Sequence, residues 1–531
     1  MKGMKSIRAA VLLLVLFRGG VGLGQDADAT PWGRVPAKPM AVFSVRDGQA
    51  FWRGYASSGL GVMLRELHAV FATNQPAWSG GCLPLELLST NTFAQCSRWT
   101  WYAPFSAPAD SASLPWQLEA YGVPPEDRTD RFVWAVSSNR FVVGPVGVSL
   151  ATEPWKSGFL DARVLSYVLP DADFLFWFDA RAVLGSGYFD SSPGWRSAVA
   201  QTGIDSVKGL LVSGVFGETG TRIRANLIAT GQFTGLWEAL IPLDRPSVLS
   251  PTVPRTALEA LRGRFNFAHL LACLLKAAKG QGYLESDLFV ASKGNPGISV
   301  RKSLLPYVGT DLVYFRESPK SKNWAALSET PVALALESND SEALLSSVGA
   351  LLISWYGADV SVVSEQWTEH TLMTVDALND RVRLPIGGRR LVFWAAAGVL
   401  YGAGSQQTIM SLQTPEGENA LVGSSVLADH YRALGGPVGF SYYQNHRAYA
   451  RLFWSLLRFL PGSAVGMEFP GWKLSLPAGV AWGELPDFDR LARAFGYGVV
   501  NMRGDSKAIT LDYLAPGAPK SGAGAGSAPS K

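Results

Sequence analysis

Apolar and polar positions recur along the chain in one order: a proline, a short apolar strand, an Asp or Asn, and an apolar helix. The order is clearest in residues 169–183, 253–278 and 436–460, and a looser copy lies at 39–67. In the helical parts the apolar residues return every three or four positions, which is the period of one helix face. The pattern therefore predicts a repeated strand–helix unit. This pattern predicts how the chain folds, and it does not indicate any reaction.

Two of these units end in strongly amphipathic helices. One apolar stripe consists of Phe267, Leu270, Leu271, Leu274 and Leu275, and the other of Tyr449, Leu452, Phe453, Leu456, Leu457 and Leu460. Asn266 and Asn445 stand before these helices, and Asp179 stands before a third at 180–184. Asp and Asn favour helix starts because their side chains accept hydrogen bonds from otherwise unpaired N–H groups. We interpret the three polar residues as helix caps, not as catalytic groups.

Pairs of strands follow the units. Residues 207–216 and 221–230 flank a Gly-Glu-Thr-Gly turn, and residues 498–501 and 508–513 flank Arg503-Gly504-Asp505-Ser506. Between 330 and 405 the pattern predicts a strand, a helix at 341–356, and three or four further strands. Hairpins interspersed with helices favour an α+β fold. We expect repeated strand–helix–hairpin modules, mainly antiparallel sheets with helices packed on one face.

The length of 531 residues fits two to four domains. We expect a signal peptide at 1–24 and a disordered tail, rich in Pro, Gly, Ala and Ser, at 516–531. Four modules are predicted between them: an N-terminal module at 25–165 with a Cys82/Cys96 loop, and further modules at 166–250, 251–430 and 431–515.

The first residues are typical of a secretory signal peptide. Lys2, Lys5 and Arg8 precede an apolar run at 9–17, and four glycines follow before position 25. The run is shorter than the roughly 20 residues that a membrane-spanning helix needs. We therefore expect export to a periplasmic or extracellular location, with no transmembrane anchor after cleavage.

Charge argues against a nucleic-acid partner. The chain holds 47 basic and 43 acidic residues, and four of the basic ones lie in 1–24, so the remaining chain is formally neutral. A nucleic-acid-binding protein needs a surviving basic stripe, and none is visible.

The cysteines fit export. Cys82 and Cys96 flank a loop of ordinary length, and an oxidising compartment favours a disulfide between them, although both thiols can also remain reduced. Such a bond would stabilise the fold by about 3 kcal/mol. Cys273 lies in an apolar helix and is interpreted as a small packed side chain.

Motifs for catalysis, cofactors and metals are absent from the sequence. There is no phosphate-binding P-loop and no GxSxG elbow, and the five histidines form no HExxH pair. We therefore assign no catalytic, cofactor-binding or metal-binding residues. The acidic groups at 171–173 and 484–489 are interpreted as turn and cap residues. One alternative remains, an exported hydrolase whose site combines His430, His446 and a carboxylate brought together by folding.

Aromatic residues supply the candidate ligand site. Trp99, Trp101, Tyr102 and Trp116 crowd one Pro-rich region near the proposed disulfide. Trp and Tyr side chains stack on ligands or line apolar pockets, and the alternative is a small satellite core under a long loop. Arg503-Gly504-Asp505 is an adhesion sequence in other proteins; here we interpret it as a hairpin tip.

The segments LPDADFLFWFDARAV and LLPYVGTDLVYF, with their hairpins, resemble a loose group of exported bacterial proteins of unknown function built from repeated strand–helix–hairpin modules. The resemblance covers most of 165–515, implies a cell-envelope setting, and supplies no catalytic residues. We therefore expect a non-enzymatic binding or scaffold module for a protein partner or an apolar small molecule.

Overall fold

The computed structural model describes the core of the chain in segments. These are residues 41–46, 160–185, 202–217, 220–244, 256–280, 299–319, 330–367, 370–379, 389–413, 439–458 and 482–516, the strands at 92–95, 101–104, 132–137, 140–145, 465–469 and 472–476, and single positions between them. The predicted signal peptide, both cysteines of the predicted disulfide, and the predicted tail beyond 516 lie outside these ranges.

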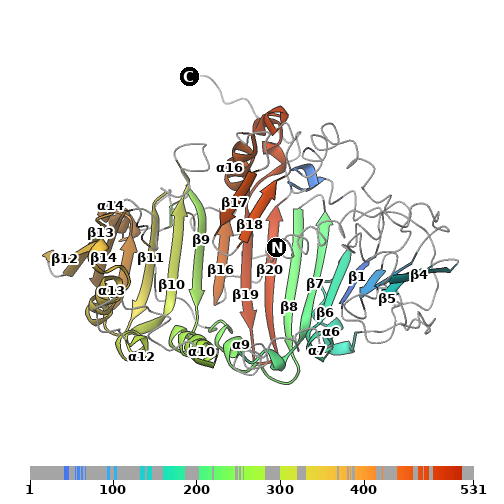
Figure 1. The fold of residues 1–531 in the computed structure, drawn as a ribbon, viewed down its shortest axis with the longest axis horizontal. Helices are drawn as coiled ribbons and strands as arrows, with labels where there is room; N and C mark the ends of the chain where they lie inside the picture. Colours follow the sequence, from blue (N-terminus) through green and yellow to red (C-terminus); the bar gives the residue numbers. More distant parts are fainter. Residues whose placement is uncertain are drawn as a thin grey trace, which may run out of the picture.

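One antiparallel sheet dominates the molecule (Figure 1). It has 18 strands, and the pairings give the spatial order β4-β5-β3-β2-β1-β6-β7-β8-β20-β19-β16-β9-β10-β11-β15-β14-β13-β12. Strands β17 and β18 form a separate hairpin. The sheet joins strands from all the predicted modules.

The strand bounds are as follows: β1 Ala41–Val45, β2 Thr92–Gln95, β3 Trp101–Pro104, β4 Phe132–Ser137, β5 Arg140–Pro145, β6 Phe174–Asp179, β7 Val207–Gly217, β8 Gly220–Ala229, β9 Ala257–Arg264, β10 Val308–Glu317, β11 Val332–Ser338, β12 Val360–Trp367, β13 His370–Ala377, β14 Arg390–Ala396, β15 Val399–Ala403, β16 Phe440–Gln444, β17 Val465–Phe469, β18 Trp472–Leu476, β19 Gly498–Gly504 and β20 Ala508–Pro516. The helices are α6 Ala162–Leu165, α7 Ala180–Gly185, α9 Leu236–Ala239, α10 Phe267–Gly280, α12 Val300–Ser303, α13 Ser341–Tyr356, α14 Gln406–Gln413 and α16 His446–Arg458, with short 3-10 turns at Ile204–Ser206, Gly357–Asp359, Trp482–Glu484, Phe488–Arg490 and Ala492–Ala494.

The predicted layered α+β arrangement is wrong. Several antiparallel sheets with helices on one face were expected, whereas the described strands, apart from the β17–β18 hairpin, form one sheet. Its described helices are few, and several of them lie at strand ends in Figure 1 instead of forming a layer. The physical reason is that α7, α10, α13, α14 and α16 each begin within three residues of the end of a strand, so the chain turns there.

Strand β14 shows why helices do not gather on one face. Its residues from Leu391 to Ala396 are all buried, so both faces of the strand are covered. Leu391 and Phe393 pack in a cluster with Leu344 of α13, whereas Val392 packs in another with Ile409 of α14. Alternate strand residues point to opposite faces, so α13 and α14 lie against opposite faces of the same strands.

Helix caps follow the predicted rule. The side chains of Asp179, Asn266 and Asn445 each accept a hydrogen bond from the backbone N–H three residues later, at 2.8, 2.9 and 3.0 Å. The Asp340 carboxylate does the same for Ala343 at the start of α13, at 3.0 Å. The cap prediction is therefore confirmed, and the α13 cap extends the same strand–Asx–helix turn to β11.

Both predicted hairpins are present as β7–β8 and β19–β20. Strands β14 and β15 are joined by Ala397 and Gly398, whose φ angles of 48° and 76° are both positive. Two central residues at positive φ are typical of the tight turn whose twist matches a hairpin.

The register brings a row of apolar residues to one face of the middle of the sheet. The row is Ile223, Tyr513, Val500, Tyr442, Leu261, Tyr314 and Leu334, on strands β8, β20, β19, β16, β9, β10 and β11. All seven are partly exposed. We call this row the central apolar face. Beyond Ile223 the next residues in register are Gly214 on β7 and the buried Phe174 on β6. Beyond Leu334 they are Gly402 on β15 and the buried Phe393 on β14.

Candidate functional site

The aromatic residues predicted to bind a ligand fall only partly within the described chain. Trp101 and Tyr102 are the first residues of β3, which pairs with β2 and β5 near one end of the sheet. Trp99 and Trp116 lie outside the described residues, as do Cys82 and Cys96. The aromatic ligand site and the disulfide therefore stay predictions.

The two histidines of the hydrolase alternative are not seen together, because His430 lies outside the described residues. His446 begins α16 and its ring lies 5.9 Å from the ring of Tyr513. A Cβ on Gly498 would come within 2.4 Å of the same imidazole. Burial lowers the pKa of His446 to about 4, so at neutral pH the ring is uncharged and packed as an aromatic group.

Of the carboxylates that the sequence interpretation assigned to turns and caps, Asp487 is used as a cap, whereas Asp173 instead links its strand to β7. Asp173 accepts a hydrogen bond from the backbone N–H of Phe216 at 2.8 Å, and Asp487 accepts one from Asp489 at 3.0 Å. Asp489 in turn pairs with Arg451 at 2.7 Å. The chain from 488 to 494 forms two short 3-10 turns, Phe488–Arg490 and Ala492–Ala494.

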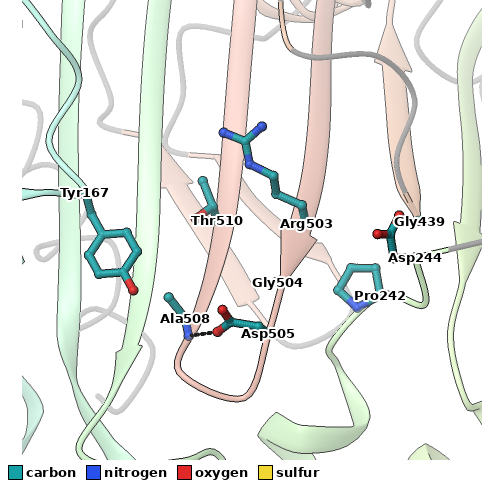
Figure 2. A pocket seen from close by; sticks show the side chains of 9 residues that line it. All are labelled: Tyr167, Pro242, Asp244, Gly439, Arg503, Gly504, Asp505, Ala508 and Thr510. Atoms are coloured by element: carbon teal, nitrogen blue, oxygen red, sulfur yellow. Dashed lines mark hydrogen bonds between the residues drawn. The ribbon is translucent and has the colours of Figure 1, made fainter.

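A pocket of about 320 Å³ lies at the tip of the β19–β20 hairpin (Figure 2). Four parts of the chain that are distant in sequence line it: Tyr167 after α6, Pro242 and Asp244 after α9, Gly439 before β16, and Arg503, Gly504, Asp505, Ala508 and Thr510 of the hairpin. Gly439 has a φ of 58°, and a Cβ there would meet Pro242 at 2.6 Å. The wall closes only because this position is glycine.

Two arginines share one buried carboxylate beside this pocket. Asp512 is 2% exposed and binds Arg224 through both oxygens, at 2.7 and 3.2 Å. Arg503 also donates to Asp512, at 3.0 Å, although 45% of its side chain is exposed. Two positive charges thus meet one negative charge, and the Arg503 guanidinium is held in place at the pocket wall. A planar guanidinium fixed in this way is suited to binding carboxylate or phosphate oxygens.

Further hydrogen bonds order the part of the pocket beside Arg503, where Thr510 is its partner on β20. The Thr510 hydroxyl donates to the Asn226 carbonyl oxygen at 2.8 Å, and the Asn226 amide donates to the backbone oxygen of Tyr167 at 3.1 Å. Asp505 accepts from the backbone N–H groups of Lys507 and Ala508 at 2.7 and 2.9 Å, which closes the hairpin turn. Because the Thr510 proton is already donated, its oxygen can only accept a further bond.

A second polar cluster lies on the central apolar face around Glu259 of β9. Three phenol groups donate to its carboxylate: Tyr314 at 2.9 Å, Tyr442 at 3.0 Å and Tyr449 at 2.6 Å. Arg316 pairs with the same carboxylate at 3.4 Å. We call these five residues the Glu259 cluster. It ties α16 to β9, β10 and β16.

Electrostatics keeps the phenols of the Glu259 cluster protonated. Burial, and next the adjacent negative charge of Glu259, raise the pKa values of Tyr314, Tyr442 and Tyr449. All three hydroxyls therefore act as donors at neutral pH, so the Glu259 charge is held by four partners. Arranged in this way, the carboxylate serves to hold elements together and is poorly placed to accept a proton from a substrate.

No group of three or more His, Cys, Asp or Glu side chains suited to a metal ion occurs within the described segments. No helix among these segments is long and apolar enough to cross a membrane. Comparisons of the chain with protein-family models, with curated proteins and with solved structures find no match.

Sequence reasoning missed both polar sites. One feature of the sequence could have indicated the Glu259 cluster: the charged Glu259 lies between Leu258 and Ala260 in an apolar stretch. A Glu in such a stretch is rarely buried unless it is paired. The pocket had a weaker signal: Arg503-Gly504-Asp505 was recognised as a hairpin tip, but its partners Tyr167 and Asp244 are hundreds of residues away along the chain.

Proposed function

We propose that this protein is an exported, non-enzymatic binding or scaffold module that presents the central apolar face to a protein partner or an apolar ligand. The observation that carries the proposal is the row of seven partly exposed side chains, four aliphatic and three tyrosines, in register across seven neighbouring strands. The hydroxyls of Tyr314 and Tyr442 are bound to Glu259, which leaves the rings for contact. Contiguous exposed apolar surface marks interaction sites in soluble proteins.

The size of this face favours a protein partner over a small ligand. Seven strands about 4.8 Å apart span roughly 29 Å, which is the scale of a protein contact. A small apolar molecule is better served by an enclosed pocket that buries most of its surface. Aromatic residues such as Tyr442 and Tyr513 are also common in the cores of interfaces.

The chemistry of the described polar groups supports a binding role. Asp179 and Asn445 cap helices, Glu259 is held by three phenols, and His446 is buried and uncharged. Each is occupied by a structural contact. General acid–base catalysis instead needs a group placed within hydrogen-bond reach of a substrate.

The test compares the purified full chain with a Val500→Glu variant. Pull-down from an envelope extract identifies protein partners, and mass spectrometry of the extracted protein identifies bound lipid. We expect a partner that binds the native chain and is lost with Val500→Glu, because a charge at the centre of an apolar contact must be desolvated. Lipid recovered with the native chain but lost with Val500→Glu would identify the occupant as an apolar ligand.

The matched control is Val363→Glu, which places the same charge on β12 at a site that is 55% exposed and away from the central apolar face. Circular dichroism establishes that both variants fold. The proposal fails if the native chain retains neither partner nor lipid, or if both variants bind equally well.

A further inference from the structure

The pocket at the β19–β20 tip belongs to a different surface from the central apolar face. On β20, Tyr513 points to that face, whereas Thr510 and Asp512 point to the other side because alternate strand residues do. Buried polar residues continue from the pocket along this second side, through Asn226, Asn501 and Ser441. A ligand here meets polar groups set among apolar side chains.

One wall of the pocket offers a positive group. Arg503 is oriented by its hydrogen bond to Asp512, at 3.0 Å. The negative charge of Asp512 is already largely balanced by Arg224, at 2.7 Å, so Arg503 keeps most of its positive charge for a ligand. Almost half of the Arg503 side chain remains exposed. A partly exposed guanidinium with a fixed plane binds a carboxylate with little loss of side-chain entropy.

The remaining polar walls offer acceptors. Asp244 is exposed at the pocket rim, and its carboxylate makes no hydrogen bond to the described part of the chain. Asp505 is fixed by two backbone N–H groups on one of its oxygens, which leaves the other oxygen for a donor. Thr510 has committed its proton to Asn226. These three side chains favour a ligand group that donates several hydrogen bonds and carries positive charge.

We infer that this pocket binds a small zwitterion, a molecule with a carboxylate and an ammonium group such as an amino acid or a short peptide. The carboxylate pairs with Arg503, and the ammonium group lies between Asp244, Asp505 and the Thr510 oxygen. The volume of about 320 Å³ is at the small end of ligand pockets, which suits a ligand of this size. The site is independent of the central apolar face.

Isothermal titration of the full chain tests this inference. The probes are the common amino acids and the dipeptides Gly-Gly and Ala-Ala, with acetate and ethylamine as compounds that carry one charge each. We expect saturable binding by at least one probe that carries both charges, and weaker binding of acetate and ethylamine. Tighter binding of dipeptides than of free amino acids would identify peptide ends as the ligand; the reverse order would identify free amino acids.

Two variants locate the site. Asp244→Asn and Arg503→Gln each remove one charged partner and are expected to weaken binding about tenfold or more. Asp359→Asn, which removes an exposed carboxylate far away beside β12, is expected to leave it unchanged. Thermal unfolding of each variant shows whether the fold is retained. Absence of saturable binding by every probe overturns the inference, as does native-like binding by both pocket variants, or binding of acetate or ethylamine as tight as that of the zwitterions.

Discussion

His446 shows how a single residue couples the fold to pH. Its pKa is lowered to about 4 by burial beside Tyr513 and Gly498, whereas histidine in an unfolded chain has a pKa of about 6.5. Between these values the unfolded chain binds a proton that the folded chain excludes, so stability falls as the pH falls through this window.

We expect the free energy of unfolding to fall by about 2 kcal/mol between pH 7 and pH 5 because of this residue. Urea unfolding at the two pH values measures the loss, and a His446→Gln variant is expected to lose much less. An equal loss in the variant would show that other groups cause the acid sensitivity. The control is His269→Gln. His269 lies on α10, where its Nε2 is 3.7 Å from the Cys273 sulfur.

Tyr449 tests the Glu259 cluster at the same scale. A Tyr449→Phe variant removes the shortest of the three phenol bonds, 2.6 Å, while keeping the ring. Because a bond to a charged acceptor is worth about 1.5–3 kcal/mol, we expect the free energy of unfolding to fall by about 2 kcal/mol.

The matched control for Tyr449→Phe is Tyr443→Phe. Tyr443 lies on the opposite face of β16, and its hydroxyl makes no hydrogen bond to the described residues. Its loss is expected to change stability by less than about 0.5 kcal/mol. Equal effects of the two variants in urea unfolding would mean that the phenol–carboxylate bonds contribute little.

At the scale of elements, the sequence predicted helices, hairpins and caps correctly where each depends on residues close together in the chain. The predicted helix at 341–356 coincides with α13, and both predicted hairpins form. The Asx residues before α7, α10 and α16 were predicted as caps because a cap depends only on residues three positions away. Periodicity and capping are readable from sequence for this reason.

Element packing was not readable in the same way. The continuous apolar run of β14 indicated burial but not that α13 and α14 cover opposite faces. The layered fold was predicted because helices and hairpins alternate along the chain, and this order does not say which strands pair. Pairings such as β8–β20 and β9–β16 join segments far apart in sequence. The pocket and the Glu259 cluster depend on those pairings, so neither site was predictable from local pattern.

At the scale of the whole molecule, β16, β19 and β20 lie between β8 and β9 in the sheet. The bidentate Arg224–Asp512 pair crosses the β8–β20 junction, joining residues 288 apart. The C-terminal module is therefore the connection between two halves of the sheet. Outside the sheet, the predicted modules at 166–250 and 251–430 also touch directly, since the Leu243 N–H donates to the Arg264 backbone oxygen at 2.9 Å.

A chain truncated after residue 430 is expected to lose cooperative unfolding, because β8 and β9 would become unpaired edges. Differential scanning calorimetry of the truncated and full-length chains measures this. A single sharp transition in the truncated chain, close to that of the full chain, would show that the sheet does not depend on this connection.

At this scale we propose that the central apolar face is a binding surface. The most direct measurement is site-specific photo-crosslinking in the cell envelope, with a benzophenone side chain in place of Leu261 on this face. As a control, the same group replaces Leu378, which is 63% exposed elsewhere. Binding at the central apolar face predicts one defined adduct from position 261, absent from position 378 and abolished by Val500→Glu. No adduct at 261, or an adduct that survives Val500→Glu, would contradict it.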